Sequence, residues 1–500
     1  MTDTLDLAAS PGRPPAGTDA PDRSRWLALV VIAVAQLMVV LDASIVNIAL
    51  PSAQRALHIS TSERQWVITA YTLTFGGFLL LGGRIADYVG RKRMFLIGLI
   101  GFASSSALGG AALNGPMLFA SRALQGTFAA ILAPAALSLI TVTFTEVHER
   151  AKAFGVYGAV SGGGAAIGLV MGGVLTEYAS WRWCLLVNVP IAVLTAVAAS
   201  AIVRESKAPG NTSYDIPGTL TVTAGLAALV YGFTTAAQDG WSSTTTVGFL
   251  GVAVVLLAAF VVIELRTDHP LLPLRVVLDR NRGGSYLASF LVGSGMMGMF
   301  LFLTFCFQGT LGYSALRSGF AFLPFSAGII VAATVSSRIL PRVGPRPLMA
   351  AGFGAAAVGM AWLSQVGVHT AYLTHVLPAE AFLSLGLGLA FVPMGSTALL
   401  GVGHHDAGVA SALVNTSQQI GGSLGTALLN TVAASATAAY LASHALSPAT
   451  VAAAQVHGFT LGFWIAAACL ATAAAAALVV VRASRTDLHA LSAMAVPAAG

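Results

Sequence analysis

Charged residues are scarce in this 500-residue chain, where they make up 9% of the sequence. Soluble domains carry about 25% charged residues. Hydrophobic residues make up 56%, and the mean hydropathy is +0.81. This composition excludes an ordinary soluble enzyme and predicts an integral membrane protein. The formal net charge of +6 therefore has to be interpreted from the positions of the cations, and it does not indicate nucleic-acid binding.

Cysteine is also rare, and the three cysteines stand in separate apolar runs: Cys184, Cys306 and Cys469. Their spacing argues against both a disulfide framework and a zinc site. The chain has no Gly-x-x-x-x-Gly-Lys-Ser/Thr loop, so it encodes no ATP-driven pump. His404, His405 and Asp406 are adjacent, and adjacent positions do not share a helix face. We therefore expect no metal site and no cofactor.

Long apolar runs fill most of the remaining sequence. Residues 1–25 are polar and rich in Pro, which predicts a disordered tail, and residues 483–500 form a second tail. Crossing a bilayer takes ~20 residues in a helix. Fourteen runs approach this length, at 26–49, 65–84, 93–113, 115–138, 151–175, 182–203, 217–237, 247–265, 285–308, 318–337, 347–366, 376–399, 408–435 and 458–481. The sequence predicts an all-α integral membrane protein with fourteen transmembrane helices.

The Lys and Arg distribution predicts the orientation. With the amino terminus in the cytoplasm, twenty of the 25 Lys and Arg residues lie in cytoplasmic segments and Arg122 lies inside a span. The external loops hold the other four, Arg55, Arg64, Arg182 and Arg317. Cytoplasmic loops of membrane proteins are enriched in Lys and Arg. We therefore expect a multi-pass protein of the cell membrane with both termini in the cytoplasm.

An internal repeat divides the predicted spans into two halves. Residues 337–346 align without gaps with residues 83–92, so that Gly344 meets Gly90, and Gly421 and Gly425 lie over Gly164 and Gly168 at a nearly equal offset. Repeats of this kind are typical of secondary transporters. The repeat predicts two pseudo-symmetric six-helix bundles, 26–203 and 285–482, with two inserted helices in 204–284.

The turn between the second and third spans carries the most specific motif. Residues 82–93 read GGRIADYVGRKR, which resembles the loop signature of the major facilitator superfamily, with Ile85 in place of Leu. A carboxylate and cations at facing helix ends can form contacts that break when the halves rock. We expect this turn to act as a gate latch. The alternative is that the cations only set the orientation of the protein in the membrane. The motif residues are Gly83, Asp87, Gly90, Arg91, Lys92 and Arg93.

Three further segments narrow the resemblance. Residues 41–51 (LDASIVNIALP), 122–126 (RALQG) and 181–190 (WRWCLLVNVP) look like signatures of the fourteen-spanner drug:proton antiporter family within the superfamily. The resemblance covers about residues 26–482 and implies efflux of drugs or antibiotics. It also implies that the Arg122 motif takes part in proton transfer.

Asp42 and Arg122 are the expected coupling residues. An ionised carboxylate among apolar neighbours at the depth of Asp42 is costly, so we expect this group to exchange a proton between the two sides. Arg122 cannot lose its proton, and Gln125 lies on the same helix face, which favours an electrostatic role for both. The alternatives are that Asp42 is a structural acceptor and that Arg122 joins helices by binding carbonyl groups.

The fifth predicted span carries small residues on one face, and they resemble the antiporter signature of the family. They are Gly164, Gly168, Gly172 and Gly173. Small residues let two helix backbones approach closely, so packing is an equally good explanation. Leu169 stands where that signature has proline. This departure keeps uptake by proton symport open as an alternative to export.

Substrate contacts are expected near the midplane between the halves. Aromatic, Met and amide side chains suit varied amphipathic ligands, although they also pack helices. The candidates are Trp66, Tyr71, Met296, Phe300, Phe307, Asn415 and Gln418. We expect a monomeric transporter that exchanges an organic compound for protons. A membrane enzyme or assembly factor is a weaker alternative, because the chain offers no convergent nucleophile or acid–base set.

Overall fold

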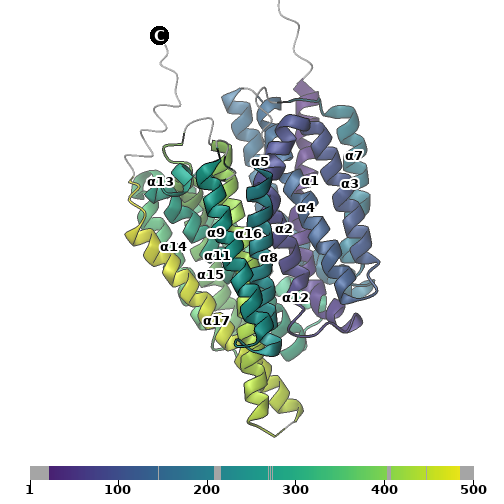
Figure 1. The fold of residues 1–500 in the computed structure, drawn as a ribbon, viewed down its shortest axis with the longest axis vertical. Helices are drawn as coiled ribbons and strands as arrows, with labels where there is room; N and C mark the ends of the chain where they lie inside the picture. Colours follow the sequence, from purple (N-terminus) through teal and green to yellow (C-terminus); the bar gives the residue numbers. More distant parts are fainter. Residues whose placement is uncertain are drawn as a thin grey trace, which may run out of the picture.

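The computed structural model describes residues 22–144, 146–207, 215–267, 270, 272, 274–402, 407–445 and 447–484. All regular secondary structure in these ranges is helical, as predicted. The helices lie side by side in one elongated bundle (Figure 1). α1 begins and α17 ends at the same end of this bundle (Figure 1), which we call the terminal end, and the opposite end is the distal end. The pair His404 and His405 lies outside the described residues.

The first half of the chain forms one side of the bundle (Figure 1). Its first helix begins within the predicted tail, because Asp22 to Arg25 are already helical. The predicted sixth span is interrupted at Val187 and becomes two helices. The helices of this half are α1 (Asp22–Ala56), α2 (Trp66–Val89), α3 (Arg91–Gly110), α4 (Gly115–Thr143), α5 (Val147–Tyr178), α6 (Trp183–Leu186) and α7 (Asn188–Ile202).

The last part of the chain forms the other side (Figure 1). Its two longest helices, α16 and α17, extend as a hairpin beyond the other helices at the distal end (Figure 1). The elements of this half are α10 (Leu274–Val277), α11 (Arg280–Phe305), η1 (Cys306–Thr310), α12 (Ala315–Ala321), α13 (Leu323–Val343), α14 (Pro345–Leu363), η2 (Tyr372–Val376), α15 (Leu377–Ala398), α16 (Ala407–Ala442) and α17 (Pro448–Val479).

Between the halves in sequence stand α8 (Ile216–Asp239) and α9 (Thr244–Arg266). α8 packs on α9, α2 and α16, so it touches both halves. Gln65 Nε2 donates to Thr234 Oγ1 of α8 at 2.7 Å, and Thr431 Oγ1 of α16 donates to the carbonyl of Phe233 at 2.9 Å. The insertion is therefore bound to each half by a hydrogen bond.

Twelve helical segments of the described residues are long and apolar enough to cross a membrane. The predicted number of fourteen is not reproduced by this criterion. The two predicted spans that are missing correspond to α2, whose described apolar stretch is Trp66–Leu79, and α14. The described apolar stretch of α2 is shorter than a span, and α14 begins with Pro345, Arg346 and Pro347, which lower its hydropathy.

Local sequence explains several helix boundaries. Asn114, Ser243 and Ser447 each accept a backbone N–H from three residues further on, which satisfies a donor that the first helical turn leaves free. Gly90 separates α2 from α3 at φ 128°, and Gly344 separates α13 from α14 at φ 86°. Only glycine adopts these angles readily. The two positions that the internal repeat aligns thus have the same structural role.

The two halves are joined in the distal part of the bundle. Arg64 Nε donates to Asn430 Oδ1 at 3.1 Å, and Asn430 Nδ2 donates to the carbonyl of Thr61 at 3.1 Å. Gln308 Nε2 donates to the carbonyl of Ile48 at 2.9 Å. One buried apolar cluster combines distal residues of α1 with the core of the second half, whereas a separate cluster fills the rest of the first half. The structure is therefore closed at the distal end.

Candidate functional site

Asp42 lies inside α1 and is fully buried. Its Oδ2 receives Arg122 Nη1 at 2.6 Å, and the contact is an ion pair. Its Oδ1 receives Gln125 Nε2 at 2.7 Å and Asn188 Nδ2 at 2.9 Å. The structure therefore brings together Asp42, Arg122 and Gln125, the three residues that the sequence singles out for coupling.

Arg122 and Gln125 reach Asp42 because they lie one turn apart on α4. Arg122 Nε also donates to the carbonyl of Val67 at 3.0 Å, and its Cζ lies 4.4 Å from the centre of the Tyr71 ring. Both partners belong to α2. Arg122 thus joins α1, α2 and α4, so the structural alternative also has support.

Asn188 and Ser106 complete this cluster, and sequence reasoning did not assign either of them to the site. Asn188, the first residue of α7, donates to Asp42 and also to Ser106 Oγ at 3.0 Å. Ser106 Oγ in turn donates to the carbonyl of Leu185 at 2.8 Å. The available signal was an amide in the middle of an otherwise apolar predicted span. The sequence does not show which way the Asn188 side chain points, because the break of the span at Val187 sets its orientation.

We call Asp42, Ser106, Arg122, Gln125 and Asn188 the Asp42 cluster. A carboxylate that is paired with a guanidinium and accepts two further donors is well stabilised in the charged form, even when it is buried. Protonation would remove the charge that holds Arg122 in place. The arrangement can therefore couple the protonation of one group to the position of α4 relative to α1.

The space on the distal side of Arg122 is apolar and small. A cavity of about 10 Å³ lies there, lined among others by Val46, Leu118 and Trp181. This is about the volume that one water molecule requires. The cavity beside Arg122 therefore has room for about one water molecule.

The motif turn is held within the first half. Glu205, which follows α7, accepts the backbone N–H groups of Lys92 at 3.1 Å and Arg93 at 3.2 Å, and its carboxylate lies 3.9 Å from Arg93 Nε. A carboxylate at a helix N-terminus is favourable, so Glu205 caps α3, a role that the sequence did not reveal. Gly83 packs against Pro134 of α4. The side chain of Asp87, the expected latch residue, lies outside the described residues.

The four glycines of α5 that resemble the antiporter signature all lie at close helix contacts. Cβ atoms added at Gly164, Gly168 and Gly172 would meet α1, at Val40, Ser44 and Ile45 respectively. A Cβ at Gly173 would instead meet Leu316 of α12, in the other half. Leu169 is buried, and its carbonyl lies against Gly319 of α12. The glycine face therefore packs α5 against α1, and Leu169 and Gly173 form part of the contact between the halves.

The predicted substrate residues do not gather in one site. Tyr71 lies under Arg122, and Trp66 packs against Tyr231 of α8 with ring centres 6.4 Å apart. Asn415 of α16 is exposed, and Gln418 of the same helix is half-buried where α16 meets α11.

Three of the predicted substrate residues belong to the core of the second half. Met296 packs against that core, and Phe300 and Phe307 join a cluster of aromatic rings. Phe300 contacts Phe322 and Phe325, while Phe307 contacts Phe322, Tyr313 and Tyr372, with ring centres 5.3–6.1 Å apart. We call these six rings the aromatic cluster.

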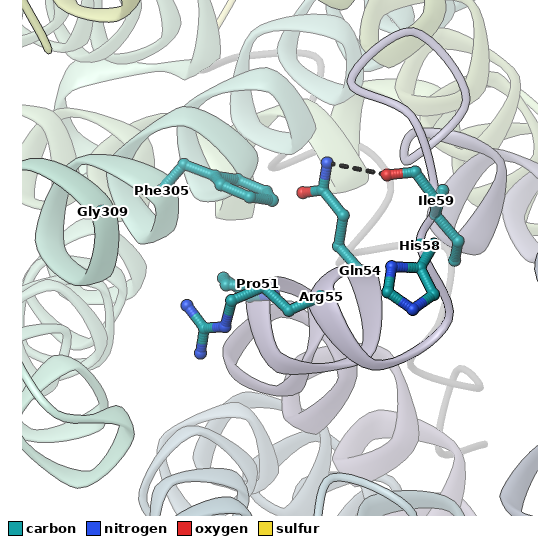
Figure 2. Close-up of a pocket in the computed structure, with 7 residues that line it drawn as sticks. All are labelled: Pro51, Gln54, Arg55, His58, Ile59, Phe305 and Gly309. Atoms are coloured by element: carbon teal, nitrogen blue, oxygen red, sulfur yellow. Dashed lines mark hydrogen bonds between the residues drawn. The ribbon is translucent and has the colours of Figure 1, made fainter. Parts of the chain in front are cut away.

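A cavity of about 410 Å³ opens between the halves at the distal end (Figure 2). Phe305 and Gly309 line it from the second half. The first half contributes the end of α1 and the residues after it, and Figure 2 shows Gln54 between Phe305 and Ile59, whose carbonyl accepts Gln54 Nε2 at 3.2 Å. The remaining lining residues are Pro51, Arg55 and His58. None of the residues that the sequence assigns to coupling or substrate binding lines this cavity.

The two helical halves and the buried ion pair in one of them define a multi-pass membrane transport protein. The model of the Major Facilitator Superfamily matches residues 32–426. The chain belongs to this superfamily, so the resemblance seen in its motifs is confirmed, and it is a transporter rather than an enzyme.

Relatives and solved structures agree with this assignment. A puromycin resistance protein from Streptomyces alboniger is 51% identical over 96% of each chain. A cephamycin export protein from Amycolatopsis lactamdurans is 40% identical over 83% of this chain and 87% of its own. Among solved structures, a peptide transporter matches with a TM-score of 0.66 over 93% of this chain and 95% of its own, at 14% identity. That likeness shows the fold.

Proposed function

We propose that this protein exports an amphipathic organic compound across the cell membrane in exchange for protons, by alternating access. The observation that carries the proposal is the Asp42 cluster, a buried carboxylate whose partners all belong to one half. A proton taken up from outside would neutralise Asp42 and release Arg122. Return of the carboxylate to its charged form would deliver the proton inside.

Export is supported by the names of the relatives, one a resistance protein and one an export protein. Uptake by proton symport rests only on Leu169 in place of a proline. In the structure the backbone carbonyl of Leu169 lies against Gly319 of α12. This contact joins the two halves, and it is compatible with export and with uptake. We therefore propose export as the direction of transport and puromycin as the first compound to test.

We further propose that α2 and α14 also cross the membrane, which gives fourteen spans with both termini in the cytoplasm. α1 ends at the distal end, whereas α3 begins beside the end of α7, where Arg91 N donates to the carbonyl of Ser206 at 3.0 Å. α2 connects these two points and therefore runs the length of the bundle. α14 likewise joins the end of α13 to η2. We propose that the protein functions as a monomer, because each half is complete within one chain.

The test uses inside-out membrane vesicles with an acidic interior, to which puromycin and a panel of lipophilic cations and neutral antibiotics are added. Antiport predicts that an added substrate dissipates the pH gradient and that Asp42→Asn abolishes this response at equal expression. Thr195→Val is the matched control, because Thr195 is buried in α7 and its hydroxyl bonds its own helix at Ile191. Proton release that requires the compound to be loaded inside the vesicles would instead show symport. Unchanged proton release in Asp42→Asn would remove Asp42 from the coupling mechanism.

A further inference from the structure

A second carboxyl group is buried in the other half. Glu380 lies in the first turn of α15 and is fully buried. Its Oε1 has no hydrogen-bond partner, and Glu380 takes part in none of the ion pairs found among the described residues. A desolvated carboxylate without a cation is very costly, unlike that of Asp42. The site as built therefore suits the neutral, protonated acid.

The contact with Tyr372 leads to the same conclusion. Tyr372 Oη lies 2.7 Å from the carbonyl oxygen of Ala321 and 3.5 Å from Glu380 Oε2. A phenol has one proton, and the shorter contact, to a carbonyl that can only accept, uses it. The 3.5 Å contact between Tyr372 Oη and Glu380 Oε2 is therefore weak, and it does little to offset a charge on the carboxyl group.

The other titratable groups on the elements around α15 do not offset a charge on Glu380. His375 of η2 has its Nε2 3.1 Å from the carbonyl of Trp362, and Tyr313 is covered by the guanidinium of Arg317, whose Cζ lies 3.9 Å from the ring centre. Cys306 of η1 is a buried thiol, and Tyr440 of α16 stacks on His444. The arginines of α11, α13 and α14 lie in the last two helical turns at the terminal end: Arg280, Arg282, Arg338, Arg342 and Arg346.

The site of Glu380 is connected to the contact between the halves. Ala321, which accepts from Tyr372, is the last residue of α12. α12 packs on α5 of the first half, where the backbone N–H of Leu316 donates to Glu177 Oε2 at 2.9 Å and Gly319 lies against Leu169. Separation of the halves at the distal end has to move α12 from α5, and this would give water access to the region of Tyr372 and Glu380.

We propose that Glu380 is a second proton-binding site, loaded from the distal side when the distal end closes. On opening, the O–H bond of the Glu380 carboxyl breaks, its proton passes to a water molecule of the distal solution, and a carboxylate remains. On closing, a proton from that solution re-forms the O–H bond before the carboxylate is buried. Its role in transport rests on the proposed function, since it makes closure toward the outside depend on external protons.

The first test is infrared difference spectroscopy of the purified protein in lipid nanodiscs between alkaline and acidic buffer. The Asp42→Asn variant is used, so that the result does not depend on the proposed coupling residue. We expect a band of a protonated carboxyl that disappears in the Asp42→Asn/Glu380→Gln variant. Ser384→Ala, a buried polar position one turn further along α15, should leave the band unchanged. Tyr372→Phe should shift the carboxyl band without removing it. If Glu380→Gln does not fold, Tyr372→Phe is the variant used in its place.

The second test measures closure of the distal end. In a cysteine-free background, Gln308→Cys places a thiol at the contact with Ile48, and labelling from outside with a membrane-impermeant maleimide reports opening. Ser443→Cys lies in the exposed distal hairpin, and its labelling rate corrects for the change of thiol reactivity with pH. In Asp42→Asn, corrected labelling should rise with external pH, and Glu380→Gln should remove this rise. A rise that persists in Glu380→Gln, or a carboxyl band that it does not alter, would overturn the proposal, whether or not substrate-driven proton exchange is found.

Discussion

Arg122 and Asp42 face each other inside the first half, with Arg122 Nη1 2.6 Å from Asp42 Oδ2 and side chains that are 2% and 0% exposed. Removal of one member of such a pair leaves the other charge buried alone, which costs about 3–5 kcal/mol. Removal of both charges costs less. Single and double variants of the pair can therefore be compared by their stability alone, without a transport assay.

Arg122→Gln should lower the free energy of unfolding by about 3–5 kcal/mol, because Asp42 loses its counter-ion. In Asp42→Asn/Arg122→Gln the loss should be smaller than in Arg122→Gln alone. Thermal unfolding in detergent, followed at matched protein and lipid content, measures the difference. Equal losses in the single and double variants would show that the guanidinium acts only through Val67 and Gln125.

Asn188→Ala should lower the free energy of unfolding by about 1.5–3 kcal/mol, because the amide donates to a charged carboxylate. It should also slow substrate-dependent proton release, since Asp42 Oδ1 keeps only one donor. Thr195→Val, on the same helix, should affect neither quantity. If Asn188→Ala matched this control in the vesicle assay, Asn188 would not help to position Asp42.

Gly168→Ala should lower the free energy of unfolding by about 1–3 kcal/mol, the usual cost of overpacking. The added Cβ would collide with Ser44 Oγ and the backbone of α1. Gly163→Ala is the matched control on α5, because a Cβ there meets nothing within 4 Å, and it should be neutral or slightly stabilising. Equal unfolding temperatures for the two variants would show that α5 does not pack tightly on α1.

Asn430→Ala should favour opening at the distal end. It removes the acceptor of Arg64 and the donor to Thr61, and it leaves the buried guanidinium against the rings of Phe305 and Phe459. Labelling of Gln308→Cys from outside should increase several-fold, since about 1.4 kcal/mol corresponds to a factor of ten in an opening equilibrium. Thr437→Val, further along α16, should leave the labelling unchanged, because the Thr437 hydroxyl bonds only the carbonyls of Ala433 and Ala454, both in the second half. A rate equal to that of the control would exclude the Asn430 contacts as a restraint on opening.

The sequence was sufficient to predict the class of the fold, because hydropathy and a repeated glycine turn are local properties. Gly90 and Gly344 could be aligned from their neighbours alone, and both adopt a positive φ. Asp42, Arg122 and Gln125 could be selected because charged and amide groups are rare in apolar spans. Their mutual contact depends on how α1 and α4 pack, which the sequence pattern does not specify.

Other residues could not be found in this way. Ser106 is an ordinary span residue until the packing of α3 places it beside Asn188. Tyr71 was predicted as a substrate contact, and its place beside Arg122 follows from the packing of α2. Glu205 looks like a loop carboxylate, and its role follows from the return of α7 to the start of α3. Arg64 was counted as an external loop cation, yet it is 5% exposed, because the contact between the halves encloses it.

Every member of the Asp42 cluster comes from the first half of the chain, on α1, α3, α4 and α7. The two halves can therefore change their relative orientation without remaking any bond in the cluster. The proposed coupling site around Asp42 is in this sense a self-contained module. Evolution, or a chimera that joins this half to the second half of a relative, could exchange the compound that is carried while the energy source stays the same.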